Sequence, residues 1–207
     1  MTVDPVALRV LIAEDFDLVA EAFEALLSTE PGIEVVGRVG RGDLVLDAVA
    51  KHLPDVAILD VDMPGIDGIA AAAQLRVAHP QCRVLLLTAL PGSGHLHRAL
   101  AAGVSGYLVK ATTGTRLIEA IRTVADGGTV IDPQIAVDAL RSGPNPLTPR
   151  EIDILRLVDE GVTTDTIAAR LHLSAGTVRN YLSNAMTKLD AATRVEALNA
   201  ARRRGWL

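Results

Sequence analysis

Short apolar runs that end directly at polar residues are the main feature of the first 110 residues. The runs and the residues that follow them are Leu8–Ala13 with Glu14 and Asp15, Val56–Leu59 with Asp60, Val84–Leu87 with Thr88, and Tyr107–Val109 with Lys110. Such runs, separated by amphipathic stretches, are typical of parallel strands buried on both faces. Because ligands bind at the carboxyl ends of parallel strands, we expect all these polar groups to meet at one edge of a sheet.

Strand and helix signals alternate as far as Asp126, and Ile33–Val39 supplies one more strand. The alternation predicts right-handed crossovers and a doubly wound α/β fold. Five parallel strands are the size of a flavodoxin-like domain. The helices are expected over Phe16–Leu27, Asp43–His52, Asp67–Ala78, His95–Ala102 and Arg116–Ala125.

The strand pattern stops at Gly127-Gly128, and a short helical stretch follows at Gln134–Arg141. Ser142–Pro146 contains two prolines and a glycine, which is typical of a linker. Only helical periodicity appears beyond this segment. We therefore expect an α/β domain over residues 1–126, a connecting helix and linker over residues 127–146, and a helical domain over residues 147–207.

Composition and charge restrict the class of protein. Cys82 is the only cysteine among 207 residues, so no intrachain disulfide can form. No apolar stretch reaches the roughly 20 residues that cross a membrane, and Met1–Pro5 lacks the pattern of a signal peptide. A cytoplasmic location without a membrane partner is therefore expected. Residues 1–146 carry 11 basic and 18 acidic residues, whereas residues 147–207 carry 9 and 7, which indicates two parts with different roles.

The expected edge of the sheet has the chemistry of a magnesium and phosphoryl site. Mg²⁺ prefers hard oxygen ligands, which Asp15 and Asp60 can supply, while Glu14 can hold a water. Asp60 is also a possible nucleophile toward phosphorus. Lys110 offers a compact cation for a phosphoryl oxygen, and Thr88 offers a hydroxyl.

The same residues resemble a known family. The matching segments are Ile12–Asp15, Asp60–Gly65 with Asp67-Gly68, Leu87–Ala89 and Gly106–Lys110. Through them the chain resembles, from about Leu8 to Ala125, the receiver domain of bacterial response regulators. The resemblance implies that Asp60 accepts a phosphoryl group from a sensor histidine kinase, and that Asp15, Asp60 and the backbone carbonyl of Asp62 bind Mg²⁺. It also implies a switch pair, in which Thr88 moves toward the phosphoryl group and Tyr107 turns inward.

Capping signals divide residues 147–207 into helices. Thr148, Pro149 and Glu151 have the pattern of an N-cap, a first-turn proline and a capping box. A second helix is expected from Thr163 or Thr164, and after a short turn Ser174 caps a third helix over Ala175–Leu189. Two helices joined by a tight turn predict a helix-turn-helix, although the same periodicity also fits an ordinary helical bundle.

The third of these helices has an apolar face and a polar face. Arginine can read guanine and asparagine can read adenine in the major groove. Thr177 and Lys188 flank the polar face and are better placed for phosphates. The candidate DNA-binding residues are Thr177, Arg179, Asn180, Ser183, Asn184 and Lys188.

Leu147–Glu151, Gly176–Tyr181 and Arg194–Ala197 resemble motifs of the NarL/FixJ (LuxR-type) family. The resemblance implies an all-α, four-helix DNA-binding domain with a recognition helix at Ala175–Leu189 and a dimerising helix near Thr193–Arg203. The function predicted for the whole chain is that of a phosphorylation-activated transcriptional regulator, not an enzyme. Its partners would be a sensor histidine kinase, promoter half-sites and a second copy of the chain.

Two alternatives to this function remain open. Asp60-Val61-Asp62 resembles the paired aspartates of haloacid-dehalogenase-type phosphatases, in which the first aspartate is a nucleophile. That family has its further acids downstream, whereas Glu14 and Asp15 lie upstream. The other alternative is a dimeric DNA-binding regulator that does not depend on phosphate.

Overall fold

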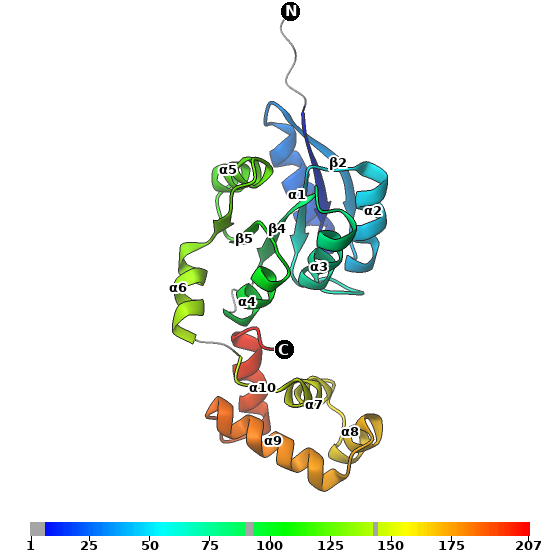
Figure 1. Cartoon of the computed structure of the whole chain (residues 1–207), viewed down its shortest axis with the longest axis vertical. Helices are drawn as coiled ribbons and strands as arrows, with labels where there is room; N and C mark the ends of the chain where they lie inside the picture. Colours follow the sequence, from blue (N-terminus) through cyan, green and yellow to red (C-terminus); the bar gives the residue numbers. More distant parts are fainter. Residues whose placement is uncertain (1–6, 90–92, 143–144) are drawn as a thin grey trace, which may run out of the picture. The chain divides into compact units, whose positions relative to one another are not determined.

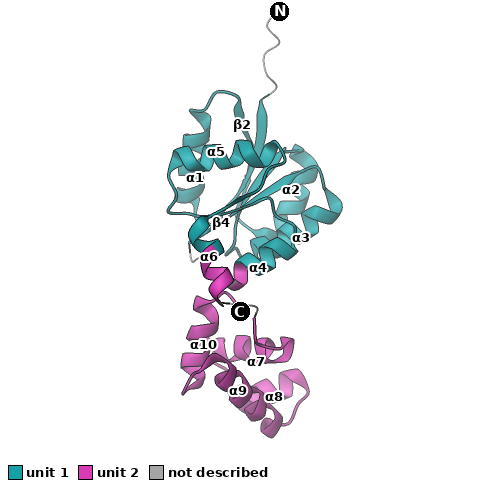
Figure 2. Cartoon of the chain, turned by 60° about the vertical axis from the view of Figure 1, so that its left-hand side comes forward, with its two compact units in different colours: residues 1–90, 96–136 teal, residues 91–95, 137–207 magenta. Residues whose placement is uncertain are grey.

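The computed structural model of the chain describes residues 7–89, 93–142 and 145–207. The chain divides into two compact units, residues 1–90 with 96–136 and residues 91–95 with 137–207 (Figure 2). Gly143 and Pro144 of the predicted linker lie outside the described residues. The predicted domain boundaries at 126 and 146 remain predictions.

A parallel sheet forms the centre of the first unit (Figure 1). Its strands are β1 (Leu8–Ala13), β2 (Ile33–Val39), β3 (Val56–Asp60), β4 (Arg83–Thr88), β5 (Gly106–Val109) and β6 (Val130–Ile131). The strand order β2-β1-β3-β4-β5-β6 reverses direction at β1, and this switch point is where doubly wound sheets bind ligands. The predicted fold class is confirmed.

The sheet has one strand more than the five that we predicted. Strand β6 consists of two residues, which is too short to show any periodicity in the sequence. It joins the edge of β5 through backbone hydrogen bonds, from Val130 N–H to Ser105 O and from Asp132 N–H to Tyr107 O. The addition leaves the switch point unchanged.

Helices cover both faces of the sheet. They are α1 (Asp17–Ser28), α2 (Val45–His52), α3 (Gly68–Ala78), α4 (Ser93–Ala101) and α5 (Gly114–Ala125), with a 3-10 turn, η1, at Gly42–Leu44. Figures 1 and 2 show α1 and α5 on one face and α2 and α3 on the other. On β1, Val10 and Ile12 belong to the core beneath α1 and α5, and the intervening Leu11 is equally buried. Burial of both faces explains why the strands are continuous apolar runs.

The helical part of the chain has its own core. The helices are α6 (Pro133–Ser142), α7 (Pro149–Asp159), α8 (Thr164–Leu171), α9 (Ala175–Leu189) and α10 (Arg194–Arg203). Side chains of Thr148, Thr163, Ser174 and Thr193 cap α7 to α10, so the predicted helix starts are correct. Residues from α7 to α10 pack around the only tryptophan, Trp206. Among the described residues, no helix has the length and apolar character that a membrane crossing requires.

Candidate functional site

Polar side chains that follow or end three strands, β1, β3 and β5, meet at the carboxyl edge of the sheet. Glu14 and Asp15 follow β1, Asp60 ends β3, and Lys110 follows β5. Lys110 Nζ lies 2.6 Å from Glu14 Oε2 and 3.0 Å from Asp60 Oδ2. The side chains of Glu14 and Asp60 are 2% and 3% exposed, so one ammonium compensates two buried carboxylates.

The same carboxylates fit a divalent cation. Glu14, Asp15 and Asp60 each offer an oxygen, and these oxygens all lie within 4.8 Å of one another. Asp15 Oδ1 and Asp60 Oδ1 are buried and accept no hydrogen bond from any described residue. Buried acceptors without a partner are costly, and carboxylate oxygens are the ligands that Mg²⁺ prefers. Glu14 is less available as a ligand, because it pairs with Lys110 and accepts a 3.3 Å hydrogen bond from Phe16 N–H.

Burial raises the pKa of Asp60 to about 6; Lys110 opposes this shift and Glu14 adds to it. Burial lowers the pKa of Lys110, but its hydrogen bonds to Glu14 and Asp60 outweigh that effect and raise it overall. At neutral pH the ammonium is therefore charged and Asp60 is mostly ionised. The site has more negative than positive charge, which favours a bound cation.

Thr88 and Tyr107, the predicted switch pair, are both fully buried on neighbouring strands β4 and β5. Burial raises the pKa of Tyr107 far above its usual value, and the nearby Thr88 hydroxyl partly opposes this. Tyr107 Oη has no hydrogen-bond partner of ordinary geometry within the described residues. The Tyr107 side chain therefore lies inward, on the strand next to that of Thr88.

The loop after β3 is packed closely against the backbone of Asp60. Gly68 N–H donates a 2.9 Å hydrogen bond to Val61 O. A Cβ at Gly68 would lie 1.9 Å from Asp60 O, so only glycine fits there without displacing the end of β3. Asp62, whose backbone carbonyl is a predicted metal ligand, has an exposed side chain in this loop.

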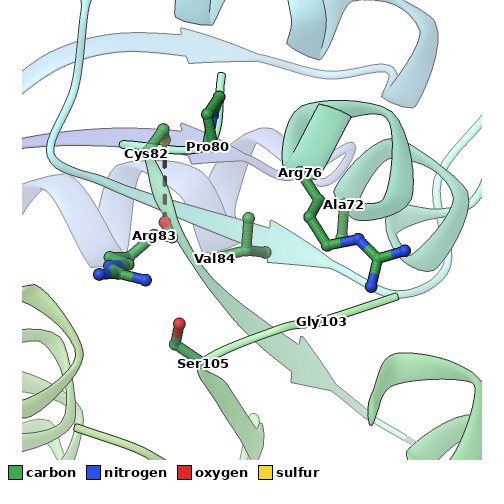
Figure 3. A pocket seen from close by; sticks show the side chains of 8 residues that line it. All are labelled: Ala72, Arg76, Pro80, Cys82, Arg83, Val84, Gly103 and Ser105. Atoms are coloured by element: carbon green, nitrogen blue, oxygen red, sulfur yellow. Dashed lines mark hydrogen bonds between the residues drawn. The ribbon is translucent and has the colours of Figure 1, made fainter. Parts of the chain in front are cut away.

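A separate cavity of about 200 Å³ lies at the opposite, amino-terminal end of β4. Figure 3 shows Arg76 and Arg83 on either side of it, with Ser105 below. Arg76 donates a 3.1 Å hydrogen bond to Ala101 O, at the end of α4. This guanidinium therefore holds a helix C-terminus, and the cavity contains none of the predicted site residues.

In the helical unit, α9 presents the predicted polar face to solvent. Arg179, Asn180, Ser183 and Asn184 are exposed, while Val178, Leu182, Ala185 and Leu189 are buried in the core. Thr177 is half-buried, and its hydroxyl lies 2.8 Å from that of the N-cap Ser174. Arg179 makes no ion pair with any residue that the structure describes, so its guanidinium is available to a ligand.

Lys188 has a different environment from the other DNA-binding candidates. Its ammonium lies 3.0 Å and 2.7 Å from the two carboxylate oxygens of Glu151, at the start of α7. From the sequence, Glu151 is predicted only to be part of the capping box. The sequence shows both residues, Glu151 in the Leu147–Glu151 motif and Lys188 near the end of α9. It contains no local signal that pairs them, because the contact depends on how α7 and α9 pack.

Both parts of the chain match models of known families. Residues 10–122 match the response regulator receiver domain, and residues 145–201 match the luxR family of bacterial regulatory proteins. The first match alone covers more than half of the chain.

Individual proteins resemble the chain over nearly its whole length. Transcriptional regulatory protein DesR of Bacillus subtilis is 40% identical over 199 residues, which cover 96% of this chain and 98% of DesR. The crystal structure of ChrA, a response regulator of a heme-sensing two-component system, is 29% identical with a TM-score of 0.59, and covers 98% of this chain and 100% of its own. The response regulator RcsB in complex with DNA has a TM-score of 0.66 over 95% of this chain and 98% of its own, but at 24% identity it shows the fold alone.

The two family matches agree with the two folds, and DesR, which the match covers over 98% of its length, is a transcriptional regulatory protein. The chain therefore belongs to the response regulators that join a receiver domain to a luxR-type DNA-binding domain, and it is a transcriptional regulator of that family.

Proposed function

We propose that Asp60 is the phosphoacceptor of this regulator and that a sensor histidine kinase supplies the phosphoryl group. The observation that supports this most strongly is the position of Asp60: it is buried at the end of β3, one oxygen pairs with Lys110, and the other has no partner among the described residues. Such an oxygen is desolvated but charged at neutral pH, and is suited to attack phosphorus.

In the proposed step, a carboxylate oxygen of Asp60 forms a bond to phosphorus while the bond from phosphorus to the kinase histidine nitrogen breaks. The electron pair of the broken bond returns to the imidazole. Lys110, which lies beside Asp60 Oδ2, remains to pair with a phosphoryl oxygen. Thr88 would donate its hydroxyl to another phosphoryl oxygen, and Tyr107 would then occupy the space that Thr88 leaves.

Asp15, Asp60 and the backbone carbonyl of Asp62 would hold Mg²⁺, with Glu14 orienting a coordinated water. When bound, Mg²⁺ would supply positive charge that offsets the charge of the carboxylates and of the incoming phosphoryl group. The unpartnered oxygens of Asp15 and Asp60 support this assignment.

The proposed output is dimerisation followed by binding of paired promoter half-sites through α9, in the cytoplasm. Exposed polar residues on α9 support DNA contact, and RcsB, a fold relative, has been solved in complex with DNA. Because the further acids of the site, Glu14 and Asp15, lie upstream of Asp60 and a luxR-type domain follows, we propose a regulator and not a phosphatase.

Incubation with acetyl phosphate and Mg²⁺, followed by intact-mass analysis, tests the phosphoacceptor. The chain should gain one phosphoryl group and form dimers, and Asp60→Asn should do neither. Asp47→Asn, an exposed acid on α2, serves as the matched control and should behave like the unmodified chain. Full labelling of Asp60→Asn would refute the proposal. Dimerisation to the same extent with and without acetyl phosphate would favour a phosphate-independent regulator.

A further inference from the structure

An ion pair connects the first turn of α7 to the last turn of α9. The Glu151 side chain is 2% exposed, and both of its oxygens contact Lys188 Nζ. Glu151 Oε2 also accepts a 2.7 Å hydrogen bond from Thr148 N–H, and Thr148 Oγ1 accepts one from Glu151 N–H. The carboxylate is thus fixed by its own helix cap, and Lys188 is held by a fixed group.

The position of Lys188 on α9 separates it from Arg179 and Ser183. Nine residues at 3.6 residues per turn place it about 180° around the helix from Arg179. Ser183 is about 140° away by the same rule, whereas Asn184 and Thr177 lie within about 40° of Lys188. The Lys188 side chain is 34% exposed, and its ammonium turns toward α7, where both carboxylate oxygens of Glu151 contact it.

The apolar contacts between α7 and α9 do not by themselves fix the rotation of the last turn of α9. Ile154 and Leu155 of α7 pack with Val178, Leu182 and other buried residues of α9 in one core. Such contacts resist separation of the helices more than small rotations, because apolar packing is not directional. Two charge-assisted hydrogen bonds are directional and set the rotation and register of the last turn.

We propose that Glu151 is a positioning residue for sequence-specific DNA binding: through Lys188 it orients α9, and Lys188 acts through this ion pair and not as a phosphate contact. This inference rests on the proposed role of α9 in DNA contact. It replaces our sequence-based prediction that Lys188 binds a phosphate.

Two DNA duplexes of equal length distinguish positioning from phosphate contact. One is enriched from random-sequence DNA by the unmodified chain, and the other is its shuffled version. Lys188→Met and Glu151→Gln should each weaken binding to the enriched duplex about tenfold. Binding to the shuffled duplex should change less than about twofold, and the slope of log K against log salt should stay the same.

Three further variants complete the test. Glu151→Gln/Lys188→Met should be no weaker than either single variant, because both remove one interaction. Lys188→Arg keeps the charge pair and should recover most of the specific affinity. Thr148→Ala removes the N-cap of α7 but leaves the ion pair, so it should lower stability without lowering specific affinity.

A salt slope reduced by about one in Lys188→Met, with equal loss on both duplexes, would show a phosphate contact and overturn the inference. So would additive effects of the two single variants. Arg179→Ala distinguishes a wrong role for Glu151 and Lys188 from a wrong role for α9. If α9 does not contact DNA, Arg179→Ala also binds the enriched duplex with the affinity of the unmodified chain. Trp206 fluorescence verifies that each variant is folded, since Trp206 lies in the core of this unit.

Discussion

Lys110 Nζ lies closer to Glu14 Oε2, at 2.6 Å, than it does to Asp60 Oδ2. The lysine is therefore shared between an acid that is expected to be modified and an acid that is not. Glu14 can hold the ammonium in place while Asp60 changes its charge, so the cation stays available to a new anion on Asp60. The pairing also leaves Asp15 and Asp60 as the better metal ligands.

Lys110→Met removes the positive charge of Lys110 and keeps most of the aliphatic part of the side chain. We expect Mg²⁺ affinity to rise at least about fivefold, because a cation a few ångströms away costs a second cation about 1 kcal/mol even at the dielectric constant of water. Phosphoryl uptake should fall, since a phosphoryl oxygen loses its partner. Titration calorimetry with MgCl₂ measures the first effect, with the exposed Lys51→Met as control. Unchanged or weaker Mg²⁺ binding would contradict the shared-lysine geometry.

Gly68→Ala should destabilise the first unit by about 1–3 kcal/mol, the usual cost of forcing atoms into a packed site. The new Cβ would lie 1.9 Å from Asp60 O and must displace either the end of β3 or the start of α3. Urea unfolding followed by circular dichroism gives the free energy. Gly40→Ala is the control, because its Cβ would meet nothing nearer than Glu14 O at 3.7 Å. Equal losses in both variants would rule out the steric cause.

The Glu151–Lys188 pair also predicts a pH dependence. Burial raises the pKa of Glu151, but Lys188 and the Thr148 cap together outweigh burial and hold that pKa below its usual value. A carboxyl whose pKa is lowered by folding stabilises the folded state above its unfolded pKa, and this contribution disappears as the pH falls through the folded pKa. Stability reported by Trp206 fluorescence should therefore decline below about pH 4.3.

Glu151→Gln should flatten that decline, since the amide does not titrate. Asp153→Asn, which removes a half-exposed acid from the same helix, should leave it unchanged. Because other carboxyls titrate in the same pH range, the decline in stability of each variant is compared with that of the unmodified chain. A decline that is identical in Glu151→Gln would show that another acid causes it.

Much of the fold follows from local sequence signals. The predicted strands at Leu8–Ala13 and Ile33–Val39 and the helix at Ala175–Leu189 have the observed bounds. Apolar runs and side-chain caps define such elements without help from distant residues. Strand β6 was missed because two residues carry no periodicity, and its strand geometry comes only from pairing with β5.

The sequence predicts which edge of the sheet holds the polar side chains better than it predicts which of these side chains pair. Parallel topology alone brings Glu14, Asp60 and Lys110 to one edge. It does not specify that Lys110 lies closer to Glu14 than to Asp60, because this depends on side-chain torsions. The sequence predicts a phosphate contact for Lys188 from its helix face, whereas its pairing with Glu151 depends on the packing of α7 against α9.

Arg179 is the DNA-binding candidate whose role the structure makes easiest to test. It is exposed on α9 and has no ion-pair partner within the described parts of the chain, so nothing there competes with a base. Arg179→Ala should weaken binding to an enriched duplex by about 1–3 kcal/mol if Arg179 reads guanine with two hydrogen bonds.

Arg179→Lys keeps the positive charge but not the planar guanidinium that forms two parallel hydrogen bonds. If the arginine reads a base, the lysine variant should lose nearly as much specific affinity as alanine while retaining the affinity for a shuffled duplex. Full specific affinity in Arg179→Lys would instead assign the residue to a phosphate, and gel-shift titration of both duplexes distinguishes the two roles.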